Sequence, residues 1–278
     1  MKITLAKSAG FCFGVKRAID IAFKAASSGE KVYMLGDIVH NEDVVKQIRK
    51  SGIRKISGLA CGRNKALLIR AHGADLATLS LAARSGYKII DATCPMVKEI
   101  QNIAHSMEKK GCQVIIIGDK RHDEVRGIVG HLKGQAVIID SAQDLPLNRL
   151  KAIKKAAVVV QSTQNMDLAL KIVESLKKII PELLFFNTIC KPTRIRQEEI
   201  KKMPLENDVI IIIGSKKSAN TKRLHEIAAS LNRRSYWITS KNDIRRDWFR
   251  GTRKVGITAG ASTPDSTTRD IIEYIKQL

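Results

Sequence analysis

The sequence has few aromatic residues and no long apolar segment. Aromatic side chains make up 4% of the 278 residues, so there are few platforms on which nucleic-acid bases could stack. No apolar run approaches the roughly 20 residues of a membrane-spanning helix, and the first five residues match a strand rather than a signal peptide. Five cysteines are an odd number, which argues against a secreted disulfide framework. These features predict a soluble cytoplasmic protein.

Basic residues are in large excess. Lys and Arg number 49 against 27 Asp and Glu, which gives a formal net charge of +22. Such an excess favours an anionic partner, such as nucleic acid, a phosphorylated metabolite or an acidic protein. No zinc-finger, RRM or KH signature accompanies it. The densest basic stretch, residues 245–254, is interpreted as an exposed loop and helix; a docking patch for an acidic electron donor is the weaker hypothesis.

Three cysteines stand in register with a repeated apolar run that ends in glycine. Cys12, Cys94 and Cys190 each precede such a glycine by 24 residues. A polar pair follows four and six residues after each glycine: His40 and Glu42, His122 and Glu124, Ser218 and Asn220. The regularity predicts three related modules, each with one thiol and one polar pair, that converge on one site. Cys61 and Cys112 fall outside this register and are interpreted as structural.

Val/Ile-rich runs alternate with amphipathic segments along the whole chain. Further strands are expected at residues 66–70, 88–91, 136–140, 156–160, 183–187, 234–239 and 254–258, and helices at 15–26, 97–110, 167–178, 194–202 and 220–231. This alternation is typical of parallel sheets covered by helices. It predicts α/β lobes at residues 13–94, 95–189 and 190–278, with the N-terminal strand, residues 1–12, packing with the third. Each cysteine is expected at a strand end, where ligands of such sheets bind.

Three thiolates presented in this way suit a metal centre with one open position. Zinc with three cysteines and a water is one candidate, although no C-x-x-C pair is present. A cubane iron–sulfur cluster normally takes four thiolates. With three thiolate ligands, one iron stays open to substrate, and the cluster can act both as a Lewis acid and as a redox catalyst.

The polar residues near the repeated loops suit a phosphorylated ligand. Histidines, hydroxyls and backbone N–H groups at helix starts favour anionic oxygens. Glu124 is unfavourable among such groups unless it holds or transfers a proton. The alternative is a first-turn glutamate stabilised by the helix dipole. Beside His122 and in register, Glu124 is interpreted as an acid; for Glu42 the helix position suffices.

Longer motifs run from end to end of the chain. They include Gly10-Phe11-Cys12, Val39-His40-Asn41, Ala71-His72-Gly73, Asp91-Ala92-Thr93-Cys94-Pro95, His122-Asp123-Glu124-Val125, Gln161-Ser162-Thr163-Gln164, Asn187-Thr188-Ile189-Cys190 and Gly256-Ile257-Thr258-Ala259-Gly260-Ala261-Ser262. With these motifs in combination, the chain resembles members of the IspH/LytB family, the 4-hydroxy-3-methylbut-2-enyl diphosphate reductases.

The resemblance implies a trefoil of three α/β lobes around one 4Fe–4S cluster. Cys12, Cys94 and Cys190 would hold the cluster, and the substrate's allylic hydroxyl would bind the open fourth iron. Two electrons from an acidic donor, a ferredoxin or flavodoxin, would break the C–O bond, with Glu124 as the proton source. The products would be isopentenyl and dimethylallyl diphosphate, as in the last step of the non-mevalonate pathway.

The same resemblance assigns substrate-binding residues. Ser162 matches a position near the hydroxyl of the substrate. Residues that would hold the diphosphate are His40, His72, His122, Ser218, Asn220 and Ser262. The expected partners are therefore the diphosphate substrate and the acidic donor, with no membrane and no nucleic acid.

Two other classes of function stay open on the residues alone. One is a zinc- or thiol-dependent hydrolase of phosphorylated substrates that uses the same three cysteines. The other is a basic nucleic-acid-binding protein with a structural metal. A brown colour would distinguish a cluster protein from both.

Overall fold

The computed structural model describes residues 1–278, and its strands form three separate four-stranded sheets. All neighbouring strands pair in parallel. The chain divides into two compact units. The terminal unit consists of Met1–Lys16, His40–Val44 and Lys191–Leu278, and the middle unit of Arg17–Val39 and Val45–Cys190. The expected α/β class with parallel sheets is confirmed, whereas the boundaries of three lobes stay a prediction.

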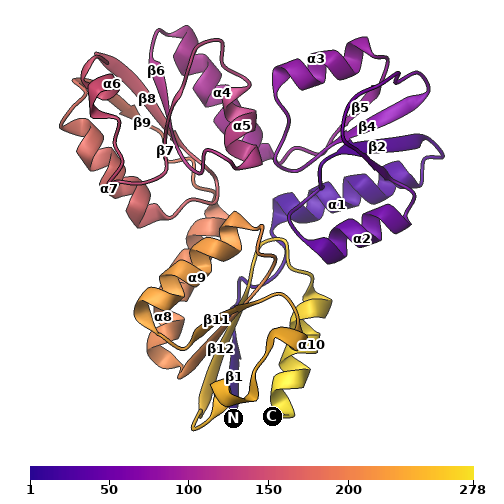
Figure 1. Cartoon of the computed structure of the whole chain (residues 1–278), viewed down its shortest axis with the longest axis vertical. Coiled ribbons are helices and arrows are strands. Elements are labelled where there is room, and N and C mark those ends of the chain that lie inside the picture. Colours follow the sequence, from indigo (N-terminus) through magenta and orange to yellow (C-terminus); the bar gives the residue numbers. More distant parts are fainter. The chain divides into compact units, whose positions relative to one another are not determined.

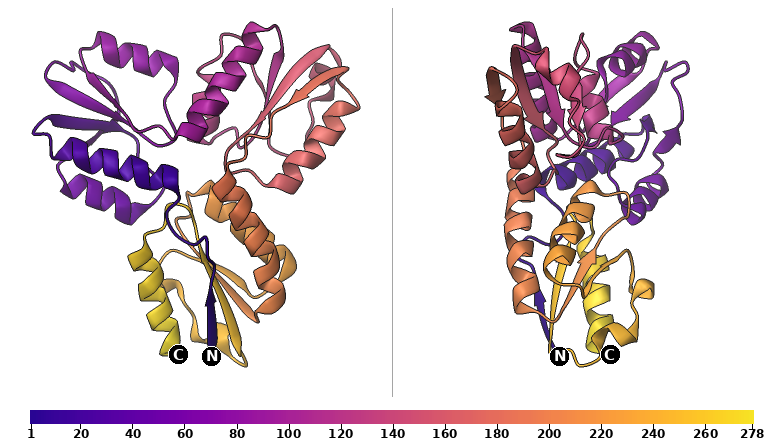
Figure 2. Two further views of the ribbon diagram at one scale, coloured as in Figure 1. Left: turned by 180° about the vertical axis from the view of Figure 1, so that it is seen from behind. Right: turned by 60° about the vertical axis from the view of Figure 1, so that its left-hand side comes forward.

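The terminal unit is built on one sheet with the strand order β1-β12-β10-β11. Its strands are β1 (Lys2–Leu5), β10 (Val209–Ile213), β11 (Ser235–Ile238) and β12 (Lys254–Ala259). Because β1 pairs with β12, the first residues of the chain belong to the same sheet as the last. Both termini lie at one end of this sheet (Figure 2).

Helices cover both faces of this sheet, as the alternation of side chains along a strand requires. Ile210 and Ile212 pack with α8 (Lys191–Glu206) and α9 (Ala219–Leu231). The intervening Ile211 packs on the other face with α10 (Asp265–Lys276) (Figure 1). Burial on both faces explains why β10 reads as an unbroken apolar run. Two short 3-10 helices, η1 (Lys241–Asp243) and η2 (Arg246–Phe249), precede β12.

The middle unit carries the other two sheets. One has the order β3-β2-β4-β5, and the other β7-β6-β8-β9. The strands are β2 (Lys31–Leu35), β3 (Arg54–Ile56), β4 (Lys65–Ile69), β5 (Lys88–Asp91), β6 (Gln113–Ile117), β7 (Val137–Ile139), β8 (Lys155–Val160) and β9 (Glu182–Phe185). The remaining helices are α1 (Phe13–Ala26), α2 (Glu42–Lys50), α3 (Leu76–Arg84), α4 (Pro95–Lys109), α5 (Asp123–Val129), α6 (Leu147–Lys151) and α7 (Met166–Lys177). None of the helices is long and apolar enough for a bilayer span.

The three cysteines in register stand at helix starts and not at strand ends, which corrects one expectation. β1 ends at Leu5 and β9 at Phe185, so a loop separates each strand from its cysteine. Before Cys12 the chain turns at Gly10, whose φ of 93° favours glycine. A Cβ at Gly10 would stand 2.6 Å from Oδ1 of Asp265. The strand itself is followed by a turn in which the backbone N–H of Ala9 donates to the carbonyl oxygen of Ala6 at 3.1 Å, and the turn at Gly10 then leads into the helix.

Candidate functional site

A buried carboxyl group is the most unusual feature of the middle unit. Glu124 is the second residue of α5, and it is 1% exposed. Its Oε1 accepts a hydrogen bond from the backbone N–H of Ser162 at 2.6 Å, and its Oε2 is 2.7 Å from Oγ of Ser162. Because β6 and β8 are neighbours in the sheet, the loops that follow them bring the two residues together.

Burial decides the protonation behaviour of Glu124. Removal from water disfavours the charged carboxylate and raises the pKa of Glu124 above its ordinary value of 4.5, while the two hydrogen bonds from Ser162 oppose this rise. The burial effect is the larger of the two. Glu124 is therefore a carboxyl group that retains its proton to higher pH than an exposed glutamate does, as a general acid requires.

Ser162 connects the carboxyl group to one of the cysteines in register. Its carbonyl oxygen accepts a hydrogen bond from the backbone N–H of Cys190 at 3.0 Å. Ser162 thus donates its backbone N–H to Glu124 and contacts the same carboxyl group through its hydroxyl. Its carbonyl oxygen accepts the hydrogen bond from Cys190. The structure holds Glu124, Ser162 and Cys190 in one hydrogen-bonded frame.

Two histidines meet beside this frame. His122 is the N-cap of α5, and its Nδ1 accepts a hydrogen bond from the backbone N–H of Glu124 at 3.2 Å. An accepting Nδ1 leaves the proton of a neutral imidazole on Nε2, so His122 offers Nε2–H as a donor. The His72 ring stands nearly perpendicular to that of His122, with 5.3 Å between the ring centroids.

An ion pair and a backbone hydrogen bond fix the His72 loop. Arg70, directly after β4, places Nη1 2.6 Å from Oδ2 of Asp123 at the start of α5. Between Arg70 and His72, the carbonyl oxygen of Ala71 accepts a hydrogen bond from the backbone N–H of Cys94 at 2.9 Å. The loop after β4 is thereby tied both to the helix of Glu124 and to the second cysteine.

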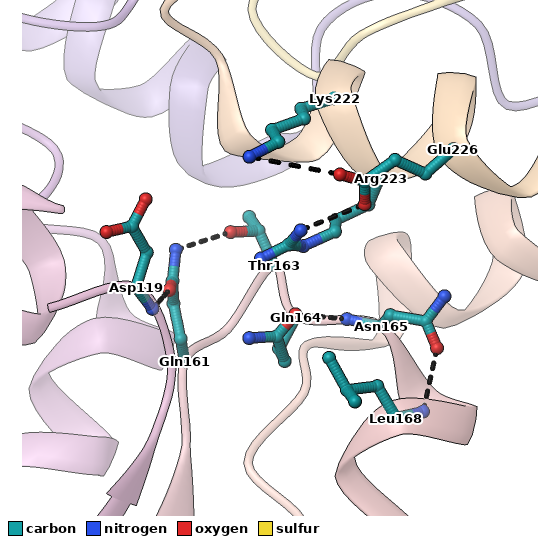
Figure 3. A network of polar contacts seen from close by, with 9 residues as sticks. All are labelled: Asp119, Gln161, Thr163, Gln164, Asn165, Leu168, Lys222, Arg223 and Glu226. Atoms are coloured by element: carbon teal, nitrogen blue, oxygen red, sulfur yellow. Dashed lines mark hydrogen bonds and ion pairs between the residues drawn. The ribbon is translucent and has the colours of Figure 1, made fainter. Parts of the chain in front are cut away.

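Gln161 supports the loop that carries Ser162. Its Oε1 accepts a hydrogen bond from the backbone N–H of Asp119 at 2.9 Å, and its Nε2 donates to Oγ1 of Thr163 at 3.1 Å (Figure 3). A Cβ at Gly118 would lie 2.8 Å from Cβ of Gln161. The glycine at the end of β6 is thus needed for the close approach of Gln161.

In the terminal unit, Cys12 stands at the start of α1. Its Sγ accepts a hydrogen bond from the backbone N–H of Val15 at 3.5 Å, and its own N–H donates to the carbonyl oxygen of Ala261 at 3.1 Å. Cys94 and Cys190 also stand at helix starts, before α4 and α8. The dipole of a helix stabilises a thiolate at its N-terminus.

These thiols fit the ligands of an iron–sulfur cluster. Cys12, Cys94 and Cys190 are partly exposed, and soft thiolates favour iron–sulfur clusters and zinc. The remaining two cysteines differ from them. Cys112 is 5% exposed and packs in an apolar cluster, whereas Cys61 lies on the surface, so a core role applies to Cys112 only.

Two side chains of α8 hold the loop that precedes Cys12. Arg196 is 4% exposed, and its Nη2 donates to the carbonyl oxygen of Gly10 at 2.7 Å. Glu199 accepts from the backbone N–H groups of Lys7 and Ser8, at 2.6 and 3.1 Å. Sequence reasoning missed both residues, because no local pattern marks a side chain that bonds to backbone almost 200 residues away. It also missed the pairing of Arg70 with Asp123 and the support from Gln161.

The other predicted polar residues of the terminal unit lie in the loops after β10 and β12 and before α2. Ser262 donates through Oγ to the carbonyl oxygen of His40 at 3.0 Å. Ser218 is the N-cap of α9 and accepts from the backbone N–H of Thr221 at 3.3 Å. Asn220 is 4% exposed, and its Nδ2 has no hydrogen-bond partner. A buried donor without an acceptor is typical of a ligand-binding position.

Glu42 occupies the first position of α2 in the terminal unit. Its Oε1 accepts a hydrogen bond from Oγ of Ser215 at 3.0 Å and stands 4.0 Å from Nζ of Lys217. The side chain is 62% exposed. Glu42 is therefore a solvated carboxylate, in agreement with its interpretation as a helix-start residue.

Comparison with known proteins supports a single family over the full length. The family model described as LytB protein matches residues 3–276. The chain is 40% identical to a 4-hydroxy-3-methylbut-2-enyl diphosphate reductase of Geobacter metallireducens over 100% of this chain and 98% of that protein. A protein of the same name from Aquifex aeolicus is 38% identical, over 99% of this chain and 94% of that protein.

Solved structures of similar proteins share the fold. The structure of an (E)-4-hydroxy-3-methyl-but-2-enyl diphosphate reductase, described as the terminal enzyme of the non-mevalonate pathway, matches with a TM-score of 0.73 at 36% identity, over 100% of this chain and 99% of that one. The Plasmodium falciparum E-1-hydroxy-2-methyl-but-2-enyl-4-diphosphate reductase matches with a TM-score of 0.90 at 28% identity, over 98% and 87%. Because the similarity in sequence and structure extends over the full length, the chain belongs to the LytB protein family.

Proposed function

We propose that this protein is a 4-hydroxy-3-methylbut-2-enyl diphosphate reductase that forms isopentenyl and dimethylallyl diphosphate in the last step of the non-mevalonate pathway. The observation that carries the proposal is the buried Glu124 carboxyl group, which Ser162 connects to the backbone of Cys190. A proton source and a candidate thiolate ligand are thus held together. The names of the relatives support the substrate.

The reaction replaces the allylic hydroxyl group of the substrate with hydrogen. Two electrons and two protons enter, the C–O bond breaks, the oxygen leaves as water and a C–H bond forms. Addition of that hydrogen at one end or the other of the allyl unit gives the two products. The protein must therefore deliver protons to a site from which bulk water is excluded.

Glu124 is the proposed source of protons. Burial raises the pKa of Glu124, so the protonated form persists to higher pH than in an exposed glutamate. In that form the proton on Oε2 lies within hydrogen-bond reach of Oγ of Ser162, 2.7 Å away. The Ser162 hydroxyl accepts this proton and points its own proton onward, so the pair forms a short relay.

The proposed ligands of the diphosphate are hydrogen-bond donors. In the middle unit these are Nε2–H of His122 and the neighbouring His72. In the terminal unit, the buried Nδ2 of Asn220 lacks an acceptor that a phosphate oxygen would supply. The complete proposed set is His40, His72, His122, Ser218, Asn220 and Ser262.

The proposed cofactor is one 4Fe–4S cluster held by Cys12, Cys94 and Cys190, with the fourth iron open. When bound, the cluster supplies electrons and a Lewis-acidic iron for the substrate's hydroxyl oxygen. An acidic ferredoxin or flavodoxin is the proposed electron donor. The cytoplasmic location stays a prediction.

The first test is an anaerobic visible spectrum of the purified protein with iron and sulfide analysis. We expect a brown protein with about four irons per chain, which reduces the diphosphate substrate when dithionite and methyl viologen supply electrons. Cys94→Ser should lose iron, whereas Cys61→Ser, at an exposed thiol outside the register, should retain it. A colourless protein after anaerobic reconstitution would contradict the proposal and favour zinc or nucleic-acid binding.

A further inference from the structure

An exposed aromatic ring follows the first cysteine directly. Phe13, the first residue of α1, is 72% exposed. Among the exposed large apolar side chains only Leu205, at 73%, is more exposed. A single exposed apolar residue needs no explanation, so the surroundings of Phe13 decide whether it has a function.

Basic side chains stand at the helix start that carries Phe13 and at a second helix start that a buried arginine connects to the loop before it. Lys16 is exposed in the first turn of α1, and Lys191 and Arg194 are exposed in the first turn of α8. Arg196 bonds both to the carbonyl oxygen of Gly10 and to that of Pro192, at 2.7 and 3.4 Å. A single guanidinium therefore holds the start of α8 beside the loop that leads to Cys12.

The position of these cations is costly for the helices. A positive charge at a helix N-terminus is unfavourable, because the helix dipole places partial positive charge there. Neither α1 nor α8 has an acidic residue in its first turn, and Lys16, Lys191 and Arg194 form no ion pair with another side chain. Exposed cations at two helix starts give this end of the unit a positive potential, which favours an anionic partner.

The densest basic stretch of the unit lies at the end of β12 opposite to Cys12. Residues 245–253 precede β12, whereas Cys12 bonds to Ala261 just beyond its end. The six residues of β12 span about 20 Å. In addition, Arg234 binds the carbonyl oxygens of Trp248 and Arg250, at 2.7 and 3.1 Å. This stretch is thus a braced loop far from the thiol.

We propose that Phe13, Lys16, Lys191 and Arg194 form the docking surface for an acidic one-electron carrier protein; this assignment depends on the proposed reductase function. An apolar ring beside basic side chains suits an acidic carrier with an apolar spot at its centre. Redox partners form small interfaces, below about 1,200 Å², which suits a surface made by two helix starts. The surface adjoins Cys12, so electrons enter close to a proposed ligand.

The test compares two charge reversals of equal size in the holoenzyme. Lys16→Glu/Arg194→Glu changes the docking surface, and Arg245→Glu/Arg246→Glu changes the distant basic stretch by the same charge. For each protein, kcat/KM with reduced flavodoxin is divided by kcat/KM with dithionite and methyl viologen. We expect this ratio to fall on the order of tenfold for the first variant and less than twofold for the second.

A direct binding measurement makes the test independent of turnover. Titration of the holoenzyme with flavodoxin should give a Kd that rises with salt, and both Lys16→Glu/Arg194→Glu and Phe13→Ser should weaken it. An equal or larger loss in the Arg245→Glu/Arg246→Glu variant would overturn the docking surface. So would an unchanged ratio in the first variant. Absence of viologen-driven turnover in the wild type would instead contradict the reductase function itself.

Discussion

Glu124 and Glu42 hold equivalent positions in two of the repeated modules, yet their surroundings are opposite. Each stands six residues after the glycine that ends a strand and near the start of a short helix. Glu124 is 1% exposed and its pKa is raised by burial, whereas the Glu42 side chain is 62% exposed beside Ser215 and Lys217. Register in the sequence thus predicts where a carboxyl group stands, but burial decides whether it retains a proton.

Exchange of each glutamate for glutamine should give the largest contrast. We expect Glu124→Gln to lower kcat by about 10²–10⁴-fold, because a general acid contributes that much, while the cluster and substrate binding stay intact. Glu42→Gln is the matched control in the equivalent position. The measurements are steady-state turnover with methyl viologen and the iron content. Wild-type turnover in Glu124→Gln would remove its role as acid.

Loss of the Ser162 hydroxyl should have a smaller effect on turnover. Ser162→Ala retains the backbone N–H bond to Oε1 of Glu124 and removes the contact with Oε2. We expect kcat to fall roughly tenfold, since one hydrogen bond to a charged or reacting group is worth about 1.5–3 kcal/mol at most. Ser162→Thr retains a hydroxyl and should restore most of the turnover. If alanine and threonine behave alike, the hydroxyl is not part of the relay.

The pH dependence of the free energy of unfolding should show the effect of burying Glu124. The pKa of folded Glu124 lies above its unfolded value near 4.5, so the folded state binds the proton more tightly. The resulting stabilisation is full below pH 4.5 and is lost as pH rises through the folded pKa. We therefore expect the free energy of unfolding of the wild type, relative to Glu124→Gln, to decrease as the pH rises above 4.5.

Urea unfolding at several pH values measures this difference. A relative stability of the wild type that increases with pH would mean that hydrogen bonds to the Glu124 carboxylate outweigh its burial.

The smallest effect is expected at Glu42 itself. Its hydrogen bond with Ser215 and its distant ion pair with Lys217 are exposed to water, and such contacts contribute about 0–1 kcal/mol. We expect Glu42→Gln to change turnover less than about twofold and the free energy of unfolding by less than about 0.5 kcal/mol. A larger loss of activity would show that this carboxylate positions the Ser215 loop for the reaction.

The parallel α/β sheets could be predicted because their signal is local. Runs such as Val209–Ile213 are buried on both faces, and an unbroken apolar run is the direct result of that burial. Short elements such as β3 and α6 were not predicted, since three to five residues carry too weak a periodicity. The predicted strand ends at the cysteines were wrong. In β1, a turn from Ala6 to Ala9 and the extent of pairing with β12 end the strand, and residue propensity does not show either.

The sequence by itself determined the fold class, the family and the register of the thiols and polar pairs, because these depend on which residues recur at which spacing. Only the tertiary structure decided that Glu124 is buried against Ser162, that Ser162 bonds to Cys190 and that Arg196 and Glu199 hold the loop before Cys12. These contacts join residues 28 to 192 positions apart. Burial and the resulting shift in pKa arise from the folded packing of distant segments, and no spacing in the sequence encodes them.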